Sequence, residues 1–210
     1  MTPGLPACFP VDVQHLTVPV PSRLLSAADR QLYCTPCPPQ SYPNPPPRVL
    51  IRKISDSRHP ANGQAGLFNA SGKALPRGTW IRDYVGWVHT EAEADPKSDY
   101  DLSLDRRVVR DERGEILRVD VIGIDATKMG GEARFVNDYR GVPGFQRPNA
   151  VFELREWDLA QTGGRVGGGK KGIRMAVWAG PHGIDKGAEI CVSYGRGFWQ
   201  KRSEEAAAQG

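Results

Sequence analysis

Short runs in which apolar and polar positions alternate dominate the chain from Arg48 onward. Alternation with a period of two is typical of a half-buried strand, because successive side chains of a strand point to opposite faces. Residues 100–104 and 117–124 alternate in this way, and residues 78–88 are rich in aromatic and β-branched side chains. Together with other short apolar runs they predict seven strands, at residues 49–54, 78–88, 100–104, 117–124, 150–154, 173–179 and 189–193. Helical periodicity is scarce and turn residues separate the runs, so the pattern predicts a mainly β domain over residues 49–200.

The first 48 residues follow a different pattern and hold twelve of the eighteen prolines. Proline has no N–H to donate to a sheet and interrupts a helix. We therefore expect residues 1–48 to form an irregular, proline-rich N-terminal extension, either a linker or an extended arm packed against the domain. Only the stretch from Ser26 to Tyr33 is able to form a short helix. A polyproline ligand is the less favoured alternative.

Two other segments lack the alternating pattern. The glycine- and lysine-rich stretch Gly163–Gly172 lies between two predicted strands, so it is expected to be a mobile loop. Residues 201–210 form a polar C-terminal tail that is expected to fray. A length of 210 residues fits one domain with such extensions.

Charge changes this picture little. The formal net charge is +4, and basic residues are mixed with acidic ones along the chain, as on a solvated surface. The run from Gly164 to Lys171 fits the spacing of a phosphate-binding loop, but Lys171 stands where Ser or Thr is needed and a strand follows. Direct nucleic-acid binding is therefore not expected.

No window approaches eighteen consecutive apolar residues, so no membrane span is expected. The N-terminus lacks the basic and apolar regions of a secretory signal. Four cysteines do not make a disulfide framework in a chain this long, which favours a reducing, intracellular location, nuclear or cytoplasmic. The pair Cys34 and Cys37 has too few neighbouring ligands for zinc, so no metal site is predicted.

Four short motifs follow one another over residues 49–199: Gly66–Ile81, Asp83–Gly86, Ile124–Asn137 and Ile184–Gly195. The pair Pro148-Asn149 lies between the third motif and the fourth. Within the third lies Ala133-Arg-Phe-Val-Asn137, and the fourth contains Glu189-Ile-Cys-Val-Ser-Tyr194-Gly195. Each motif alone is a weak signal. In this order they resemble the SET domain, the fold of most protein lysine methyltransferases.

The resemblance implies a β-clip-like fold of several small sheets with a C-terminal pseudoknot. It also implies methyl transfer from S-adenosylmethionine to the side-chain amine of a lysine in a protein or peptide substrate, histone or non-histone, a histone tail being one candidate. Such an enzyme mainly aligns two bound reactants. Tyr194 matches the catalytic tyrosine, whose hydroxyl orients the amine near the methyl group. The oligomeric state is left open.

The same resemblance assigns the binding residues. It implies donor contacts at Gly66, Leu67, Phe68, Arg134, Phe135, Asn137, Asp138, Phe198 and Trp199. It implies a lysine channel at Tyr84, Tyr100 and Val192, where aromatic faces suit an alkyl chain and an ammonium group. Tyr84 and Tyr100 are equally well interpreted as core residues, and Arg134 is favoured as a brace of the fold over a ligand contact.

Three departures from the family pattern keep other functions open. Gln64-Ala65-Gly66 stands where the family has Gly-x-Gly, Asp138 stands where it has histidine, and no Cys-x-Cys follows Gly195. The main alternative is a non-catalytic SET-fold module that binds a protein tail and has a degenerate donor site. A weaker one is an unrelated β-rich nucleic-acid binder, suggested by the basic charge and by Lys170-Lys171.

Overall fold

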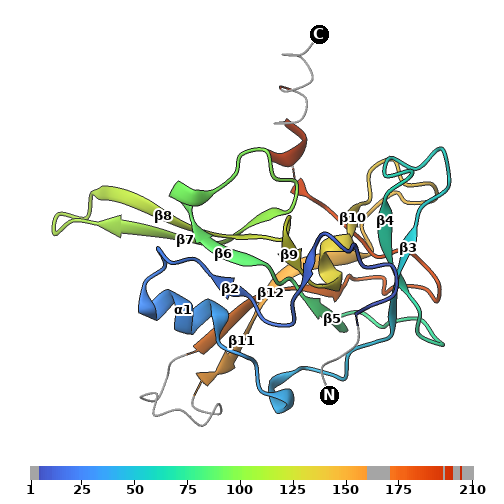
Figure 1. Cartoon of the computed structure of the whole chain (residues 1–210), viewed down its shortest axis with the longest axis horizontal. Helices are drawn as coiled ribbons and strands as arrows, with labels where there is room; N and C mark the ends of the chain where they lie inside the picture. Colours follow the sequence, from blue (N-terminus) through green and yellow to red (C-terminus); the bar gives the residue numbers. More distant parts are fainter. Residues whose placement is uncertain (1–4, 160–170, 196, 201–203, 205–210) are drawn as a thin grey trace.

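Several small β-sheets make up most of the protein in the computed structural model, which describes residues 5–159, 171–195, 197–200 and 204 (Figure 1). The mainly β class predicted from the sequence is confirmed. The strands are β1 (Gln14–His15), β2 (Val20–Pro21), β3 (Val49–Lys53), β4 (Ala65–Asn69), β5 (Trp80–Asp83), β6 (Trp87–Thr90), β7 (Asp101–Arg110), β8 (Ile116–Asp125), β9 (Met129–Gly130), β10 (Asn137–Asp138), β11 (Ala150–Asp158), β12 (Lys171–Ala179) and β13 (Cys191–Val192). The helical elements are α1 (Ala27–Cys34), η1 (Pro39–Ser41), η2 (Glu91–Glu93) and η3 (Glu132–Phe135).

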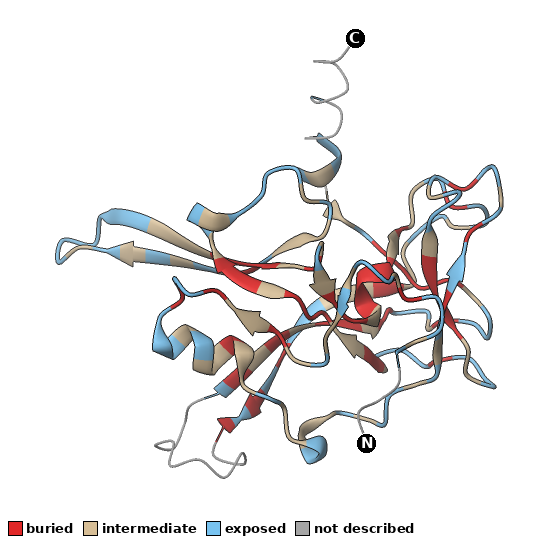
Figure 2. Ribbon diagram, viewed as in Figure 1, coloured by how far each residue is buried: buried red, intermediate tan, exposed pale blue. Residues whose placement is uncertain are grey.

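Two sheets have more than two strands in the described part of the chain, one in the order β2-β6-β8-β7 and one in the order β11-β12-β5. The pairs β3–β4, β1–β9 and β10–β13 form the two-stranded sheets. The β7–β8 hairpin projects from the body (Figure 1). Its outer part is mostly exposed, including Val108, Ile116 and Leu117, whereas the buried residues gather where the sheets meet (Figure 2).

The predicted strand at residues 78–88 is wrong, because the structure divides it into β5 and β6, which belong to different sheets. The chain turns between them beside Gly86. A Cβ at Gly86 would lie 2.4 Å from the carbonyl oxygen of Asp125, so this close approach of two backbones requires glycine. The motif Gly66–Ile81 does not form a hairpin of its own, since β4 pairs with the preceding strand β3.

The N-terminal residues 5–47 pack against the domain, as in the packed-arm interpretation. Strand β1 pairs with β9 and β2 pairs with β6. Phe9, Leu25 and Tyr33 are buried in the main core. Ser26 caps the N-terminus of helix α1, since its hydroxyl accepts a hydrogen bond from the Asp29 N–H at 3.1 Å. The predicted short helix is therefore confirmed at its first turn.

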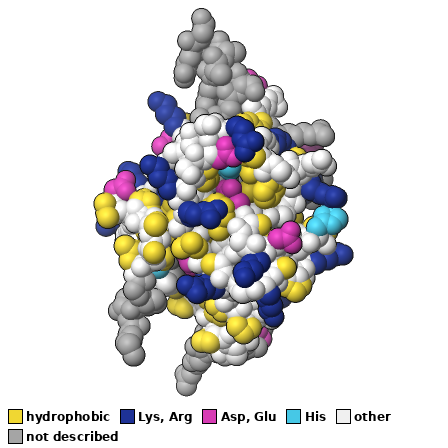
Figure 3. Space-filling model, turned by 90° about the vertical axis from the view of Figure 1, so that its right-hand side faces the viewer, with side chains coloured by type: hydrophobic (Ala, Val, Ile, Leu, Met, Phe, Trp, Pro, Cys, Tyr) yellow, Lys and Arg dark blue, Asp and Glu magenta, His cyan; other side chains and the backbone are white. Residues whose placement is uncertain are grey.

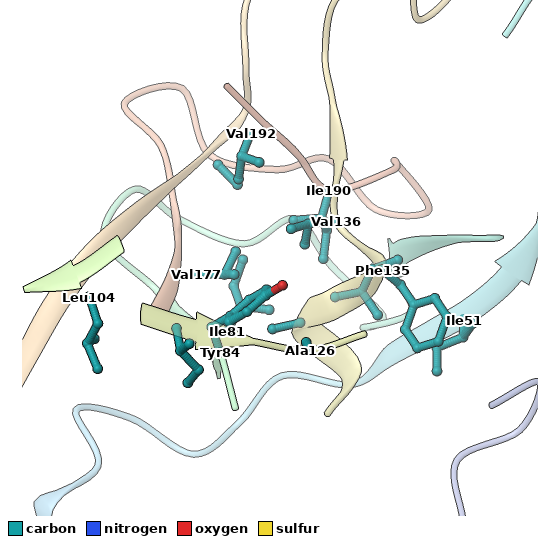
Figure 4. Close-up of a cluster of buried hydrophobic side chains, with 14 of the residues drawn as sticks. Ile51, Ile81, Tyr84, Leu104, Ala126, Phe135, Val136, Val177, Ile190 and Val192 are labelled. Atoms are coloured by element: carbon teal, nitrogen blue, oxygen red, sulfur yellow. The ribbon is translucent and has the colours of Figure 1, made fainter. Parts of the chain in front are cut away.

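One core joins the small sheets. Tyr84, Ile81, Val177 and Ala126 lie together at its centre, with Val192 nearby from the C-terminal segment (Figure 4). Burial of apolar side chains contributes about 25 cal/mol per Å² of area removed from water, which makes this core the main source of stability.

The C-terminal segment 188–193 lies between β4 and β10, which is the arrangement that positions the site. On one side, Ile190 N–H donates to the Leu67 carbonyl at 2.7 Å. On the other side, β13 runs parallel to β10. The Asn149 side chain adds two bonds to this segment, donating to the Glu189 carbonyl at 2.7 Å and accepting from Cys191 N–H at 2.8 Å.

The predicted loop at Gly163–Gly172 lies mostly outside the described residues, as does nearly all of the tail from residue 201. Among the helices that the structure describes, none has the length and apolar character needed to cross a membrane.

Candidate functional site

Tyr194 lies two residues after the end of β13 and is held at both ends. Its N–H donates to Asp138 Oδ2 at 2.7 Å, and its hydroxyl donates to the Val136 carbonyl at 2.8 Å. Burial raises the pKa of Tyr194 above its ordinary value, so the hydroxyl keeps its proton in the physiological range. The phenol oxygen therefore has a fixed position and remains able to accept a further hydrogen bond.

Two cavities share a wall at Tyr194. The first, called the Asn137 cavity, has a volume of about 690 Å³ and is lined by residues of the 59–65 turn and by Asn137, among others. The second, called the Tyr84 cavity, has a volume of about 390 Å³ and includes Tyr84 and Phe152. Residues that line both are Asp99, Tyr100, Arg134, Tyr194 and Phe198.

Asp138 joins several parts of the Asn137 cavity through hydrogen bonds. Besides Tyr194 N–H, its carboxylate accepts from Arg140 N–H and from Arg140 Nη1, both at 2.8 Å, and from Trp199 Nε1 at 3.2 Å. A carboxylate can accept several bonds at once, whereas an imidazole accepts at one nitrogen. Asp138 thus joins β10 to the chain around Tyr194 and Trp199.

Aromatic rings continue from Tyr194 along one edge of the Asn137 cavity. The rings of Tyr194 and Phe198 meet edge to face with centroids 4.9 Å apart, and those of Phe198 and Trp199 do so at 5.4 Å. Trp199 is 36% exposed although its indole N–H is bonded to Asp138. An anchored and partly exposed indole face of this kind can cover a flat ring.

Arg134 braces the fold and also lines both cavities. Its Nε donates to the Ala126 carbonyl at 2.9 Å, which braces η3 against the end of β8. Its guanidinium also lies over the Tyr100 ring, 4.2 Å from the centroid, and borders both cavities. Phe135, next in the chain, lines the Asn137 cavity and packs edge to face on Phe9.

Tyr84 lines the Tyr84 cavity and is almost fully buried. Its hydroxyl donates to the Tyr100 carbonyl at 2.7 Å, and its ring meets Phe152 edge to face at 5.7 Å. Burial raises the pKa of Tyr84 well above its ordinary value. Tyr84 and Tyr100 are therefore core residues that also form cavity wall.

Four of the residues predicted to bind ligands lie away from the cavities. Gly66, Leu67, Phe68 and Val192 are buried and do not line either one, whereas the neighbouring residues Gln64 and Ala65 line the Asn137 cavity. Phe68 instead packs against the Arg52 guanidinium. Val192 is in the core beneath Tyr194.

Gly66 is required for a reason other than ligand approach. A Cβ at this position would lie 2.6 Å from Glu189 Oε1, a side chain that is itself buried and bonded. Glycine therefore leaves space for the Glu189 carboxylate.

We expect Gly66→Ala to lower the free energy of unfolding by about 1–3 kcal/mol, because the added methyl overpacks this contact. Urea denaturation measures the change. Gly72→Ala is the matched control, since its Cβ would meet nothing within 4 Å. Equal stability of the two variants would contradict the prediction.

Comparisons with known proteins give a partial likeness to solved structures. No protein-family model matches the chain, and no curated protein matches it. Among solved structures, it is similar to the crystal structure of KRYPTONITE in complex with mCHH DNA, H3(1–15) peptide and SAH. The sequence identity is 16% and the TM-score is 0.45, covering 71% of this chain and 24% of that chain. This chain thus spans about a quarter of the other's length.

Sequence reasoning missed three residues that the structure brings to the site. His59 and Glu189 are both buried, and His59 Nε2 lies 3.0 Å from Glu189 Oε2 beside the Asn137 cavity. Asn149 holds the C-terminal segment. The motifs already contained Glu189 and Asn149, which was a usable signal, whereas nothing near His59 in the sequence indicated a partner.

The described residues contain no group of three or more histidine, cysteine, aspartate or glutamate side chains that could hold a metal ion. All four cysteines are free thiols.

Proposed function

We propose that this chain is a SET-type domain that transfers the methyl group of S-adenosylmethionine to the side-chain amine of a lysine in a protein substrate. The meeting of the Asn137 and Tyr84 cavities at Tyr194 is the observation that carries the proposal. In-line displacement at a sulfonium methyl needs donor and amine on opposite sides of that methyl, and enzymes gain much of their rate from such alignment. Two cavities with a common wall suit a reaction of this geometry.

Tyr194 would position the amine rather than exchange a proton with it. Because its hydroxyl donates to the Val136 carbonyl, its oxygen is left to accept an N–H of the incoming lysine amine. That contact would turn the amine lone pair toward the methyl group. The raised pKa of Tyr194 keeps the phenol uncharged while it does so.

The Asn137 cavity would hold the methyl donor. Its volume of about 690 Å³ falls in the range of cavities that bind small molecules and cofactors. Phe198 and Trp199 offer aromatic surface for the adenine, and Asn137 offers a polar group for the amino-acid end. Gln64 and Ala65, which line this cavity, would make the donor contacts that the resemblance implied for Leu67 and Phe68.

The Tyr84 cavity would admit the lysine side chain. The rings of Tyr84, Tyr100 and Phe152 suit the alkyl chain, and the carboxylates of Asp95 and Asp101 at its border favour a cation. A protein or peptide with an accessible lysine is therefore the proposed partner, and a histone tail is one candidate.

Two alternatives are less well supported. A degenerate donor site was suggested partly by Asp138, yet this carboxylate accepts four hydrogen bonds at the cavity. For nucleic-acid binding, the face in Figure 3 has Lys and Arg spread singly among apolar and acidic side chains, without a continuous basic patch. Nucleic-acid sites need several phosphate contacts from such a patch.

One experiment tests the proposal: binding of S-adenosylhomocysteine by calorimetry, followed by transfer of labelled methyl groups to histones and peptide mixtures. Binding together with lysine methylation that depends on Tyr194 is the expected result. A chain that binds a protein tail but not S-adenosylhomocysteine would establish the non-catalytic alternative.

We expect Trp199→Ala to weaken S-adenosylhomocysteine binding about tenfold, since stacking on an aromatic side chain contributes roughly 1–3 kcal/mol per base. Calorimetric titration measures the dissociation constant. Trp178→Ala, which removes a partly buried indole outside both cavities, is the control and should bind normally. Unchanged affinity in Trp199→Ala would show that this ring does not cover the donor.

A further inference from the structure

A buried carboxylate connects Asn137 to His59 beside the Asn137 cavity. Glu189 is 7% exposed and His59 is 6% exposed. Glu189 Oε1 accepts from Asn137 Nδ2 at 2.8 Å, and Glu189 Oε2 lies 3.0 Å from His59 Nε2. The three side chains come from separate parts of the chain, so the fold has brought them together.

The proton positions in this network follow from its outer partners. His59 Nδ1 accepts a hydrogen bond from the Ala61 N–H at 3.0 Å, so the ring proton lies on Nε2 and is donated to Glu189. Asn137 Nδ2 faces the Glu189 carboxylate and the Ala65 carbonyl, which are both acceptors. The amide nitrogen of Asn137 is therefore assigned to this side by its partners.

This orientation decides what Asn137 offers to a ligand. With Nδ2 occupied by Glu189, the atom of the amide that remains for the cavity is the oxygen Oδ1. Asn137 is partly exposed and lines the cavity. An amide oxygen is a pure acceptor, so the cavity presents at this point a partner for an N–H group. The buried carboxylate behind it also favours a cation.

We propose that His59 is a positioning residue for the methyl donor. Through Glu189 it holds the Asn137 amide with Oδ1 toward the cavity, where Oδ1 accepts from the ammonium group at the amino-acid end of the donor. This inference rests on the proposed function, because it names the part of the donor that the network recognises.

A purely structural role for the network makes a different prediction. If His59 only supported the 59–65 turn, its loss would weaken every ligand of the cavity alike. If it positions Asn137, its loss weakens only ligands that carry an amino-acid end. S-adenosylhomocysteine has that end, and 5′-methylthioadenosine has the same adenosine and thioether without it.

The experiment is calorimetric titration of both ligands into the unmutated chain, His59→Asn and His59→Gln. The Asn oxygen can take the place of Nδ1 and accept from Ala61 N–H, but its side chain is too short to reach Glu189. The Gln amide N–H can take the place of Nε2 and donate to Glu189. These two substitutions separate two hydrogen bonds of His59. One comes from Ala61 N–H and supports the 59–65 turn, and the other goes to Glu189, which in turn holds Asn137.

We expect His59→Asn to bind S-adenosylhomocysteine about tenfold more weakly, as follows from the loss of one hydrogen bond to a charged group. His59→Gln should recover most of that affinity. Binding of 5′-methylthioadenosine should be unchanged in both. If His59→Asn does not fold, His59→Phe repeats the test, because its ring fills the space without a donor.

Three results would overturn the inference: unchanged S-adenosylhomocysteine affinity in His59→Asn, an equal loss for both ligands, or no recovery in His59→Gln. If 5′-methylthioadenosine binds too weakly to titrate, the comparison of the Asn and Gln variants decides alone. Failure of the proposed function is distinguishable, since the unmutated chain would then not bind S-adenosylhomocysteine.

Discussion

Tyr194→Phe is expected to lower the rate of lysine methylation about a hundredfold or more while leaving S-adenosylhomocysteine binding within about twofold of the unmutated chain. The substitution removes only the hydroxyl, so the ring contact with Phe198 and the backbone bond to Asp138 remain. A misplaced reactant commonly costs about two orders of magnitude in rate, because the reacting atoms must be aligned to within about an ångström.

Single-turnover transfer of labelled methyl groups to a peptide measures this rate without interference from product release. The matched control is Tyr33→Phe, which deletes a buried hydroxyl that bonds to Asp105 on the β7–β8 hairpin. That residue lines neither cavity, so its variant should retain activity. A Tyr194→Phe variant with full activity would remove Tyr194 from the reaction and leave the proposal without its central residue.

The pH dependence of the reaction distinguishes titration of Tyr194 from titration of the substrate's lysine amine. The pKa of Tyr194 is raised by burial above its ordinary value of about 10, so the phenol stays protonated across the usual assay range. A rise in rate between about pH 7 and pH 9 would therefore report deprotonation of the lysine amine and not of Tyr194. Tyr194→Phe should lower the whole profile without shifting it.

Alternating and apolar runs along the chain predicted strands that belong to the larger sheets. Residues 150–154 and 173–179 became β11 and β12, and residues 117–124 became β8. The pattern failed at Gly86, because the break there depends on contact with the Asp125 backbone, which is far away in sequence. Two-residue strands such as β9 and β10 carry no periodicity to detect, so their parallel pairings could not be predicted.

The residues of the candidate site could likewise be predicted only in part from the sequence. Tyr194 and Asn137 were found because they lie in contiguous motifs, and the structure places both on the Asn137 cavity. Their roles in binding and catalysis stay predictions. The His59–Glu189 contact joins residues 130 positions apart, and an isolated histidine gives no sign of such a partner. Motifs thus identified cavity-lining residues, while the buried support behind them required the fold.

Asp83→Ala is expected to cause the largest loss of stability, about 3–5 kcal/mol in the free energy of unfolding. Asp83 accepts from Arg155 Nε at 2.6 Å and from Arg155 Nη2 at 2.5 Å, and only 4% of the Arg155 side chain is exposed. Burial alone would lower the pKa of Arg155, but its bonds to Asp83 raise it, so the guanidinium stays charged. Removal of the carboxylate leaves a buried charge without its partner, which is strongly destabilising.

Urea denaturation at constant m-value measures the change, with Asp120→Ala as the matched control. Asp120 pairs with Arg118 at 2.8 Å, but both side chains are exposed, so its removal should cost less than about 1 kcal/mol. The double variant Asp83→Ala/Arg155→Met should recover much of the lost stability, because it removes the buried charge as well. Equal stability of Asp83→Ala and Asp120→Ala would contradict the prediction. Since Asp83 adjoins Tyr84 in the sequence, a stable Asp83→Ala/Arg155→Met variant would also show whether the Tyr84 cavity needs this ion pair for methyl transfer.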